Sequence, residues 1–196
     1  MPGVRISGGT FKGLHLGCPA GRGTRPTAAV VREAIFSILG EQTVGSVVLD
    51  LFAGSGALGL EALSRGAQEA LLCDRAPFAL AALRRNVLRL PLDEQPKVRV
   101  LRVAWPGGWG ALLPLGPFSL CLLDPPYDKP ELAMDFLLQS PRNGLAAPGA
   151  AAVWEQAPAT LERWNPQDFR PWQLRLTRRW GDRAAAFLDL PASGKK

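Results

Sequence analysis

The chain has 196 residues, of which 47% are hydrophobic, and it carries a formal net charge of +6. This length fits one large domain, or one domain with a small appendage, and allows a buried core without a disulfide or metal staple. No run approaches the roughly 18 apolar residues of a membrane-spanning helix. No apolar signal segment follows the basic N-terminus. We therefore expect a globular, cytoplasmic protein with no membrane partner and no bound metal.

Basic residues are concentrated in two segments of the chain. Residues 1–32 contain no acidic residue, and their basic side chains are Arg5, Lys12, Arg22, Arg25 and Arg32. A second cluster near the C-terminus consists of Arg170, Arg175, Arg178, Arg179 and Arg183. Two separate basic segments fit a nucleic-acid surface. From charge alone, a solvated face is an equally good explanation.

The predicted elements alternate between strands and helices. Residues 4–6 and 10–12 flank a glycine pair and predict a β-hairpin, and a helix is expected from an N-cap at Thr27 to a terminator at Gly40. Apolar runs then predict strands over 47–51, 70–73, 98–103, 118–123 and 150–154. Helical patterns cover 57–65, 78–90 and 132–138, and residues 172–179 and 184–190 predict a C-terminal hairpin. Cys73 and Cys121 fall within the strands, where we expect them to be core residues.

Repeated β-α units predict an α/β fold of the Rossmann-like type, with three layers and a mostly parallel sheet. The C-terminal hairpin adds an antiparallel strand at its edge. The division that we expect is a small extension over 1–26, with a β-hairpin, and a main domain over 27–196.

A glycine-rich turn follows the first buried strand. Gly54-Ser-Gly56-Ala-Leu-Gly59 matches the pattern G-x-G-x-x-G between a strand and a helix. Its glycines permit close approach of the backbone to a ligand, and Asp74, about 20 positions on, can accept hydrogen bonds from ribose hydroxyls. Alone, the match supports a nicotinamide dinucleotide enzyme equally well. However, Asp50 before the glycines would repel a pyrophosphate and attract a cofactor that carries an ammonium and a sulfonium.

A second segment, Asp124-Pro-Pro-Tyr127, follows the fourth predicted strand. It therefore lies at the carboxyl edge, where open α/β sheets bind ligands. Because neither proline has an N–H, the segment presents only acceptors: the Asp124 carboxylate and the Pro125 carbonyl. Two acceptors can hold an exocyclic amine and stabilise the charge that develops on it. Tyr127 can stack on a base. The segment predicts an amine-methylating site.

Three N-terminal stretches narrow the family. Gly9-Thr-Phe-Lys-Gly13, Gly21-Arg-Gly-Thr-Arg-Pro-Thr27 and Val31-Arg-Glu-Ala-Ile-Phe36 resemble the RsmD family of bacterial rRNA methyltransferases. The resemblance continues through residues 50–67, Asp74-Arg-Ala76, Leu83, Asn86, Asp124–Tyr127 and Arg179-Trp-Gly-Asp182. It implies a class I enzyme that uses S-adenosylmethionine to methylate the N2 amine of a guanine in 16S rRNA, either free or in the small ribosomal subunit.

The resemblance also implies roles for individual residues. Around the cofactor, the methionine portion would be lined by Asp50, Phe52, Gly54, Ser55 and Gly56, the ribose held by Asp74, and the adenosine flanked by Arg75 and Ala104. Asp124, Pro125 and Tyr127 would hold the guanine. For the RNA, the expected contacts are Lys12, Arg22, Arg25, Thr27 and Arg32. Val103 departs from the family, which has Asp there to hold the adenine amine.

Three alternatives remain open at this point. An adenine-N6 DNA methyltransferase shares Asp-Pro-Pro-Tyr, but such enzymes usually carry a large target-recognition domain, for which little of this chain is left. A nicotinamide-dependent oxidoreductase would use the glycine turn but gives Asp124–Tyr127 no task. A non-catalytic RNA-binding module would explain the charge but not the glycine turn.

Overall fold

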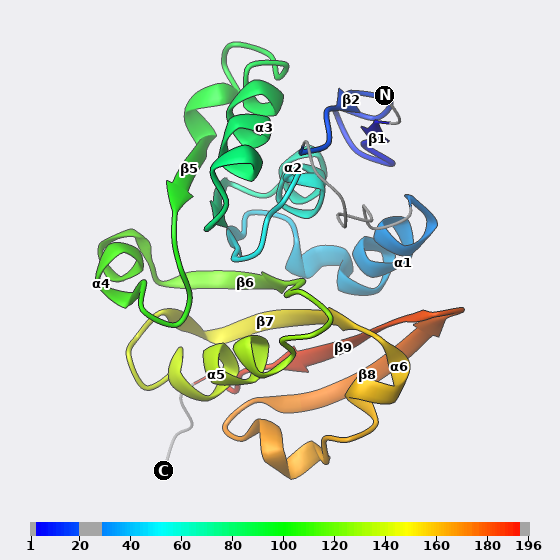
Figure 1. Cartoon of the computed structure of the whole chain (residues 1–196), viewed down its shortest axis with the longest axis vertical. Helices are drawn as coiled ribbons and strands as arrows, with labels where there is room; N and C mark the ends of the chain where they lie inside the picture. The colour runs from blue at the N-terminus through cyan, green and yellow to red at the C-terminus, as the bar shows by residue number, and fades with distance from the viewer. Residues whose placement is uncertain (1–2, 20–28, 193–196) are drawn as a thin grey trace. The chain divides into compact units, whose positions relative to one another are not determined.

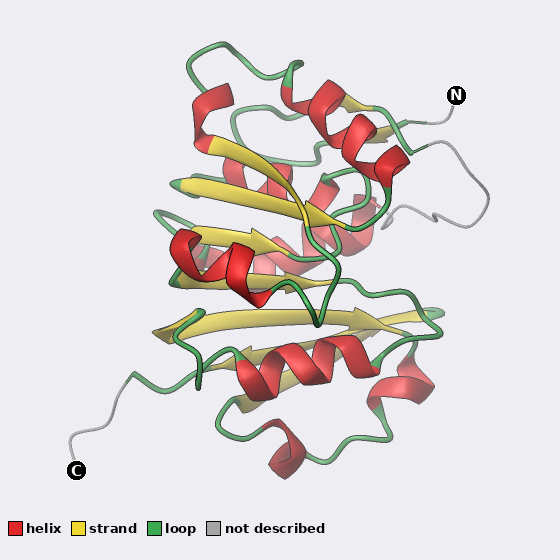
Figure 2. Cartoon of the chain, turned by 60° about the vertical axis from the view of Figure 1, so that its left-hand side comes forward, coloured by secondary structure: helices red, strands yellow, loops and turns green. Residues whose placement is uncertain are grey.

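The computed structural model describes residues 3–19 and 29–192. The chain forms two compact units, residues 1–104 and residues 105–196. Figure 1 follows the chain from blue at the N-terminus to red at the C-terminus, and Figure 2 distinguishes helices from strands. Each unit combines strands with helices, as the alternating sequence pattern predicts.

Three parallel strands form the sheet of the first unit. Their order is β5 (Val98–Arg102), β4 (Glu69–Asp74) and β3 (Val47–Asp50). Leu49 and Leu72, at the middle of their strands, are fully buried. Parallel strands that are covered on both faces need such continuous apolar runs. The strand positions predicted for this unit are confirmed, and Cys73 is a buried residue of β4 as predicted.

The helices of the first unit are α1 (Ala29–Leu39), α2 (Ala57–Ser64) and α3 (Pro77–Val87). Helix α2 contacts β3 and β4, and α3 contacts β4 and β5. Helix α1 buries Val31, Ile35 and Leu39 on one face. It ends at Leu39 as predicted, because Gly40 has a φ of 52°, a conformation that other residues rarely adopt. The predicted N-cap, Thr27, lies outside the described residues.

The predicted N-terminal hairpin has a different second strand. Strand β1 (Val4–Arg5) pairs antiparallel with β2 (His15–Leu16). The prediction of a strand over 10–12 was wrong, because those residues form a turn. Gly9 and Gly13 have φ values of 76° and 89°, and these left-handed conformations reverse the chain.

The backbone of this turn forms hydrogen bonds with helix α2 instead of with a partner strand. The Thr10 N–H donates to the Ser64 carbonyl at 2.7 Å, and the Phe11 N–H donates to Ser64 Oγ at 2.8 Å. A Cβ on Gly9 would lie 1.8 Å from the Ser64 carbonyl oxygen. The absence of a side chain there lets the turn lie directly on the helix, so the N-terminal segment is part of the first unit.

The second unit contains a mixed sheet. Its strand order is β6 (Phe118–Leu123), β7 (Ala146–Gln156), β9 (Arg183–Asp189) and β8 (Gln173–Trp180). Strands β6 and β7 are parallel, whereas β9 pairs antiparallel with both β7 and β8. The predicted C-terminal hairpin is therefore confirmed. Cys121 is fully buried in β6, as predicted.

Aromatic residues fill much of the core of the second unit. Trp154 and Trp172 are almost fully buried, and Trp172 Nε1 donates to the Leu137 carbonyl at 2.8 Å. The helices here are α4 (Trp109–Leu112), α5 (Glu131–Gln139) and α6 (Pro158–Leu161). Only α5 was predicted, because four residues are too few to show a helical period.

Candidate active site

The glycine turn connects β3 to α2 and needs glycine for two different reasons. Gly54 and Gly56 have φ values of 54° and 79°, which favour glycine. A Cβ on Gly54 would meet nothing within 4 Å, so this side of the turn is open to a ligand. In contrast, a Cβ on Gly56 would lie 2.8 Å from Leu83 Cδ2. Gly54 therefore shapes an accessible turn, and Gly56 also permits close packing against α3.

The third glycine of the pattern places α2 against the sheet. A Cβ on Gly59 would lie 2.2 Å from Leu72 Cδ2, so α2 could not pack this closely on β4 with any other residue. The Gly59 N–H donates to Asp50 Oδ2 at 2.9 Å. This hydrogen bond fixes the Asp50 carboxylate beside the first turn of α2, where free N–H groups favour a negative charge.

Asp50 is a buried carboxylate with one oxygen unused. Its exposed fraction is 1%, and among the described residues Oδ1 has no hydrogen-bond partner. Burial raises the pKa of Asp50 from 3.8 to about 7, while the Gly59 hydrogen bond lowers the pKa and the charge of Asp74 raises it further. An unpaired buried carboxylate oxygen is costly, and an ammonium group would satisfy it. Asp50 thus fits the amino group of S-adenosylmethionine.

Asp74 ends β4 and holds the glycine turn from the other side. Its Oδ2 accepts the Gly54 N–H at 3.0 Å, and its Oδ1 accepts the Ala76 N–H at 2.9 Å. Each carboxylate oxygen can accept more than one hydrogen bond, and the side chain is only half-buried. Asp74 therefore keeps acceptor capacity for a ribose diol, while the following residue, Arg75, is exposed.

The remaining residues predicted to bind the cofactor lie at the ends of these strands. Phe52 is half-buried, and Ser55 is 9% exposed. Ala104, just after β5, is exposed. The Val103 side chain is buried, and its N–H donates to the Asp74 carbonyl at 3.1 Å. Val103 thus continues the contact between β5 and β4 and offers no side-chain acceptor.

Asn86 connects the glycine turn to the N-terminal segment. This residue of α3 is fully buried. Its Nδ2 donates to the carbonyls of Ser55 and Gly17 at 2.8 Å each, and its Oδ1 accepts the Gly17 N–H at 2.8 Å. The sequence pattern predicts no role for Asn86 beyond its place in the family resemblance. Its amide is the group that fixes Gly17 beside Ser55.

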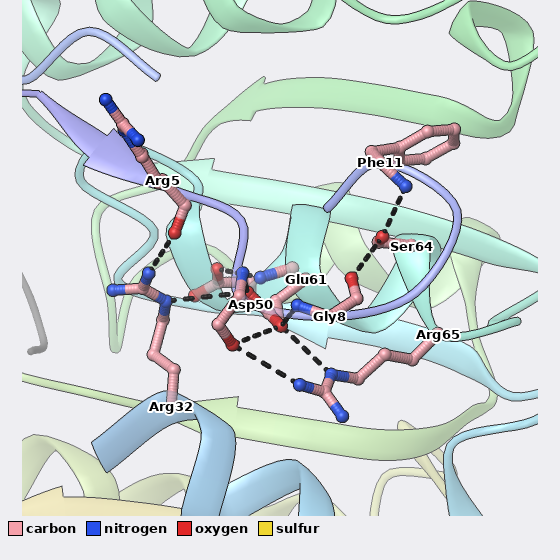
Figure 3. A network of polar contacts seen from close by, with 10 residues as sticks. Arg5, Gly8, Phe11, Arg32, Asp50, Glu61, Ser64 and Arg65 are labelled. Atoms are coloured by element: carbon pink, nitrogen blue, oxygen red, sulfur yellow. Dashed lines mark hydrogen bonds and ion pairs between the residues drawn. The ribbon is translucent and has the colours of Figure 1, made fainter. Parts of the chain in front are cut away.

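Glu61 is a structural residue that the sequence reasoning missed. It lies in α2, is fully buried, and is surrounded by the contacts shown in Figure 3. Its Oε1 accepts the Ser7 hydroxyl at 2.7 Å, the Gly8 N–H at 2.9 Å and Arg65 Nε at 2.9 Å, and its Oε2 accepts the Ser7 N–H at 2.8 Å. The available signal was a glutamate within an otherwise apolar helix, which indicates a buried, paired carboxylate.

Arg32 requires a correction. It was predicted to contact RNA, but its side chain is fully buried. Arg32 Nε lies 3.7 Å from Glu61 Oε2, and its Nη2 donates to the Arg5 carbonyl (Figure 3). Arg32 therefore neutralises Glu61 and ties α1 to the N-terminal hairpin. Of the other predicted RNA contacts, Lys12 is exposed, and Arg22, Arg25 and Thr27 lie outside the described residues.

In the second unit, the Asp124–Tyr127 segment directly follows β6. Asp124 is half-buried, Pro125 is buried, and the Tyr127 side chain is 46% exposed. The Lys129 N–H donates to the Pro126 carbonyl at 2.8 Å, which closes the turn before α5. An exposed aromatic ring beside a carboxylate suits a planar, polar ligand such as a nucleobase.

Burial and several charged residues shift the pKa of Tyr127. Burial raises the pKa of Tyr127, the cation of Arg183 lowers the pKa, and the acidic groups of Glu155, Asp124 and Asp182 raise it. Arg183 Nη1 donates to Glu155 Oε1 at 2.6 Å, and both side chains are buried. Arg183 had been counted with the C-terminal basic cluster. Because Arg183 is buried, it does not belong to an exposed basic surface. Instead, its charge acts on Tyr127.

Two other features of the described residues bear on the class of protein. Nowhere in the described ranges do three or more His, Cys, Asp or Glu residues gather in a way that could hold a metal ion. Likewise, the described ranges contain no helix that is long and apolar enough to cross a membrane.

Known proteins resemble this chain over most of its length. The model of the family described as "Conserved hypothetical protein 95" matches residues 4–188. The Bacillus subtilis protein YlbH, whose name describes it as an rRNA methyltransferase, is 38% identical over 66% of this chain and 70% of its own length. Ribosomal RNA small subunit methyltransferase D of Escherichia coli is 38% identical over 64% of this chain and 61% of its own length.

A solved structure agrees with the family match. The structure of the protein yhhF of Escherichia coli, described as a methyltransferase, is 30% identical and has a TM-score of 0.80, over 98% of this chain and all of that one. This similarity confirms the predicted α/β, Rossmann-like fold. The chain therefore belongs to the RsmD family of methyltransferases that use S-adenosylmethionine.

Proposed function

We propose that this chain transfers a methyl group from S-adenosylmethionine to the exocyclic N2 amine of a guanine in 16S rRNA. The observation that carries the proposal is the Asp124–Tyr127 segment, which offers acceptors and an exposed aromatic ring at the end of β6. The names of the relatives in Bacillus subtilis and Escherichia coli support rRNA as the substrate class.

Three residues at or just after the carboxyl ends of strands in the first unit fit the cofactor. The unpaired Oδ1 of Asp50 would accept from its ammonium, and Asp74 would accept from its ribose hydroxyls. Ala104, which is exposed just after β5, would border the adenine. When bound, S-adenosylmethionine supplies a methyl group that is activated by the sulfonium charge.

The acceptor residues must compensate for a poor nucleophile, because the lone pair of the guanine N2 is delocalised into the ring. The Asp124 carboxylate and the Pro125 carbonyl would accept the two N–H groups and fix the nitrogen for in-line attack. As N2 gains the methyl group and a positive charge, the carboxylate stabilises that charge. Asp124 then accepts the proton that N2 loses, so no covalent intermediate with the protein is needed.

The substrate base must be unpaired or extruded before it can reach these residues. Tyr127 would then stack on it, a contact worth roughly 1–3 kcal/mol in single-strand binders. Lys12, Arg22 and Arg25 belong to the N-terminal extension over 1–26, and Thr27 directly follows it; we expect these four residues to contact the RNA. The partner is either free 16S rRNA or the assembled small ribosomal subunit.

Transfer of a labelled methyl group tests the proposal. The full chain would be incubated with labelled S-adenosylmethionine and, in separate reactions, free 16S rRNA, assembled small subunits and DNA. Label at the N2 position of one guanine in either rRNA sample is the expected result. Label in adenine of the DNA alone, or tight binding of NADH without binding of S-adenosylmethionine, would overturn it.

A further inference from the structure

Three charged residues lie at one edge of the sheet in the second unit. In the parallel pair β6–β7, Leu123 is opposite Trp154, and in the antiparallel pair β7–β9, Gln156 is opposite Ala184. Asp124 follows Leu123, Glu155 follows Trp154, and Arg183 precedes Ala184. The register therefore places Asp124, Glu155 and Arg183 on three successive strands at the same edge. Adjacent strands are about 4.8 Å apart.

A buried ion pair lies at this edge. Arg183 Nη1 lies 2.6 Å from Glu155 Oε1, and the two side chains are 9% and 1% exposed. Two charges are rarely buried unless they compensate each other. Glu155 therefore holds the guanidinium at the edge where the register places Asp124. Burial lowers the pKa of Arg183, and the charges of Glu155, Tyr127 and Asp124 raise it.

We propose that Arg183, held by Glu155, is a positioning residue that provides a fixed counter-charge for the Asp124 carboxylate and the Tyr127 side chain. This inference rests on the proposed function, because it gives Asp124 the task of accepting the amine. A nearby cation favours the ionised form of a carboxylate. Only the ionised form can accept both an N–H and, later, a proton. Without Arg183, a larger fraction of Asp124 would be protonated and so unable to accept the proton that the amine loses.

The effect of Arg183 on its neighbours can be measured through the pKa of a single tyrosine. Tyr127 is the only tyrosine of the chain, so the ultraviolet absorbance of tyrosinate reports on this side chain alone. The cation of Arg183 lowers the pKa of Tyr127, whereas the carboxylates of Glu155, Asp124 and Asp182 raise it. This titration needs neither RNA nor cofactor.

The experiment titrates Tyr127 in the full-length wild type and in a set of variants. Arg183→Met should raise the pKa of Tyr127, and Glu155→Gln should lower it. Arg183→Lys should stay close to the wild type because it keeps the positive charge. The exposed Arg142 belongs to the same unit, and Arg142→Met, as the matched control, should leave the titration unchanged. Circular dichroism at each pH would confirm that the protein stays folded.

The single substitution Arg183→Met removes the cation that compensates the buried Glu155 carboxylate and could prevent folding. The double variant Arg183→Met, Glu155→Met removes both charges and retains similar volumes. Its Tyr127 pKa should lie between those of Arg183→Met and the wild type, because the effect of Arg183 exceeds that of Glu155. If the Tyr127 titration is the same in the double variant, in any single variant that folds and in the wild type, the inference is wrong.

Activity gives a second readout. In Arg183→Met, kcat should fall and the acid limb of the pH–rate profile should move to higher pH, because the carboxylate loses a nearby cation, while the affinity for S-adenosylmethionine stays the same. Arg183→Lys should keep kcat and the acid limb close to those of the wild type. A wild-type kcat and pH profile in folded Arg183→Met would overturn the inference. Failure of the wild-type chain to methylate rRNA would instead contradict the proposed function. The titration of Tyr127 does not depend on methylation, so it would still test the position of Arg183 in that case.

Discussion

Two aspartates end buried parallel strands, and their surroundings differ. Asp50 ends β3, is 1% exposed and is followed by glycines, whereas Asp124 follows β6, is half-buried and is followed by prolines. Glycines let the backbone approach a ligand and donate N–H groups, whereas prolines remove donors and stiffen the chain. One strand end is therefore suited to enclose a charged cofactor, and the other is suited to present acceptors to an amine from outside.

The largest expected effect comes from removing the buried carboxylate that connects α2 to the N-terminal hairpin. Glu61→Ala should destabilise the chain by about 3–5 kcal/mol, because it leaves Arg32 buried without its counter-charge. Urea unfolding followed by circular dichroism measures the change. Glu94 forms an exposed pair with Lys97 at 2.8 Å, and Glu94→Ala should cost at most about 1 kcal/mol. Equal losses in the two variants would show that the Glu61 network adds no support.

Substitution of Asp124 should have a smaller effect on stability than Glu61→Ala but a large effect on turnover. Asp124→Ala should lower kcat by about 10²- to 10³-fold, because the developing charge on the amine loses its stabilising carboxylate. Single-turnover transfer of a labelled methyl group to rRNA measures the rate. Asp128 is exposed four residues further on, and Asp128→Ala is the matched control, with turnover close to that of the wild type. Near-normal turnover in Asp124→Ala would contradict the proposed chemistry.

The burial of Asp50 predicts a dependence of stability on pH. Its pKa is raised to about 7, so the folded state binds this proton more tightly than the unfolded state. The stability from Asp50 is complete below its ordinary pKa of 3.8 and is lost as the pH rises through about 7. Relative to the wild type, Asp50→Asn should therefore gain stability between pH 5 and pH 8, by at most about 1.4 kcal/mol per pH unit. Thermal unfolding without cofactor at several pH values measures this gain, and a pH-independent difference would contradict the assignment.

The sequence predicts most of the strands and the positions of both candidate ligand-binding segments, because each depends on a local pattern. Apolar runs identify β3, β4 and β6, and glycines and prolines mark the turns that follow. The Glu61 network could not be predicted in the same way, since Glu61 contacts Ser7 and Gly8 from 54 and 53 residues away. For the same reason the roles of Arg32 and Arg183 were misread. The number of basic residues in a segment does not show which of them are buried in an ion pair with a glutamate from another part of the chain.

The smallest expected effect concerns the exposed N-terminal turn. Lys12→Ala should weaken RNA binding and reduce the slope of log K against log salt by about 0.7–0.9, if Lys12 contacts one phosphate. Filter binding to 16S rRNA over a range of salt concentrations measures the slope. Lys97 is another exposed lysine of the same unit, and Lys97→Ala is the matched control. An unchanged slope in Lys12→Ala would remove this residue from the RNA surface.

Titration of S-adenosylmethionine into Asp50→Asn and Asp124→Ala at pH 8 tests the contrast between the two aspartates most directly. Calorimetry should show an affinity about 10- to 100-fold lower in Asp50→Asn, because the cofactor ammonium loses a charged hydrogen bond. Asp124→Ala should bind the cofactor as tightly as the wild type. The account is contradicted if Asp50→Asn binds normally, or if Asp124→Ala is the variant that loses cofactor affinity.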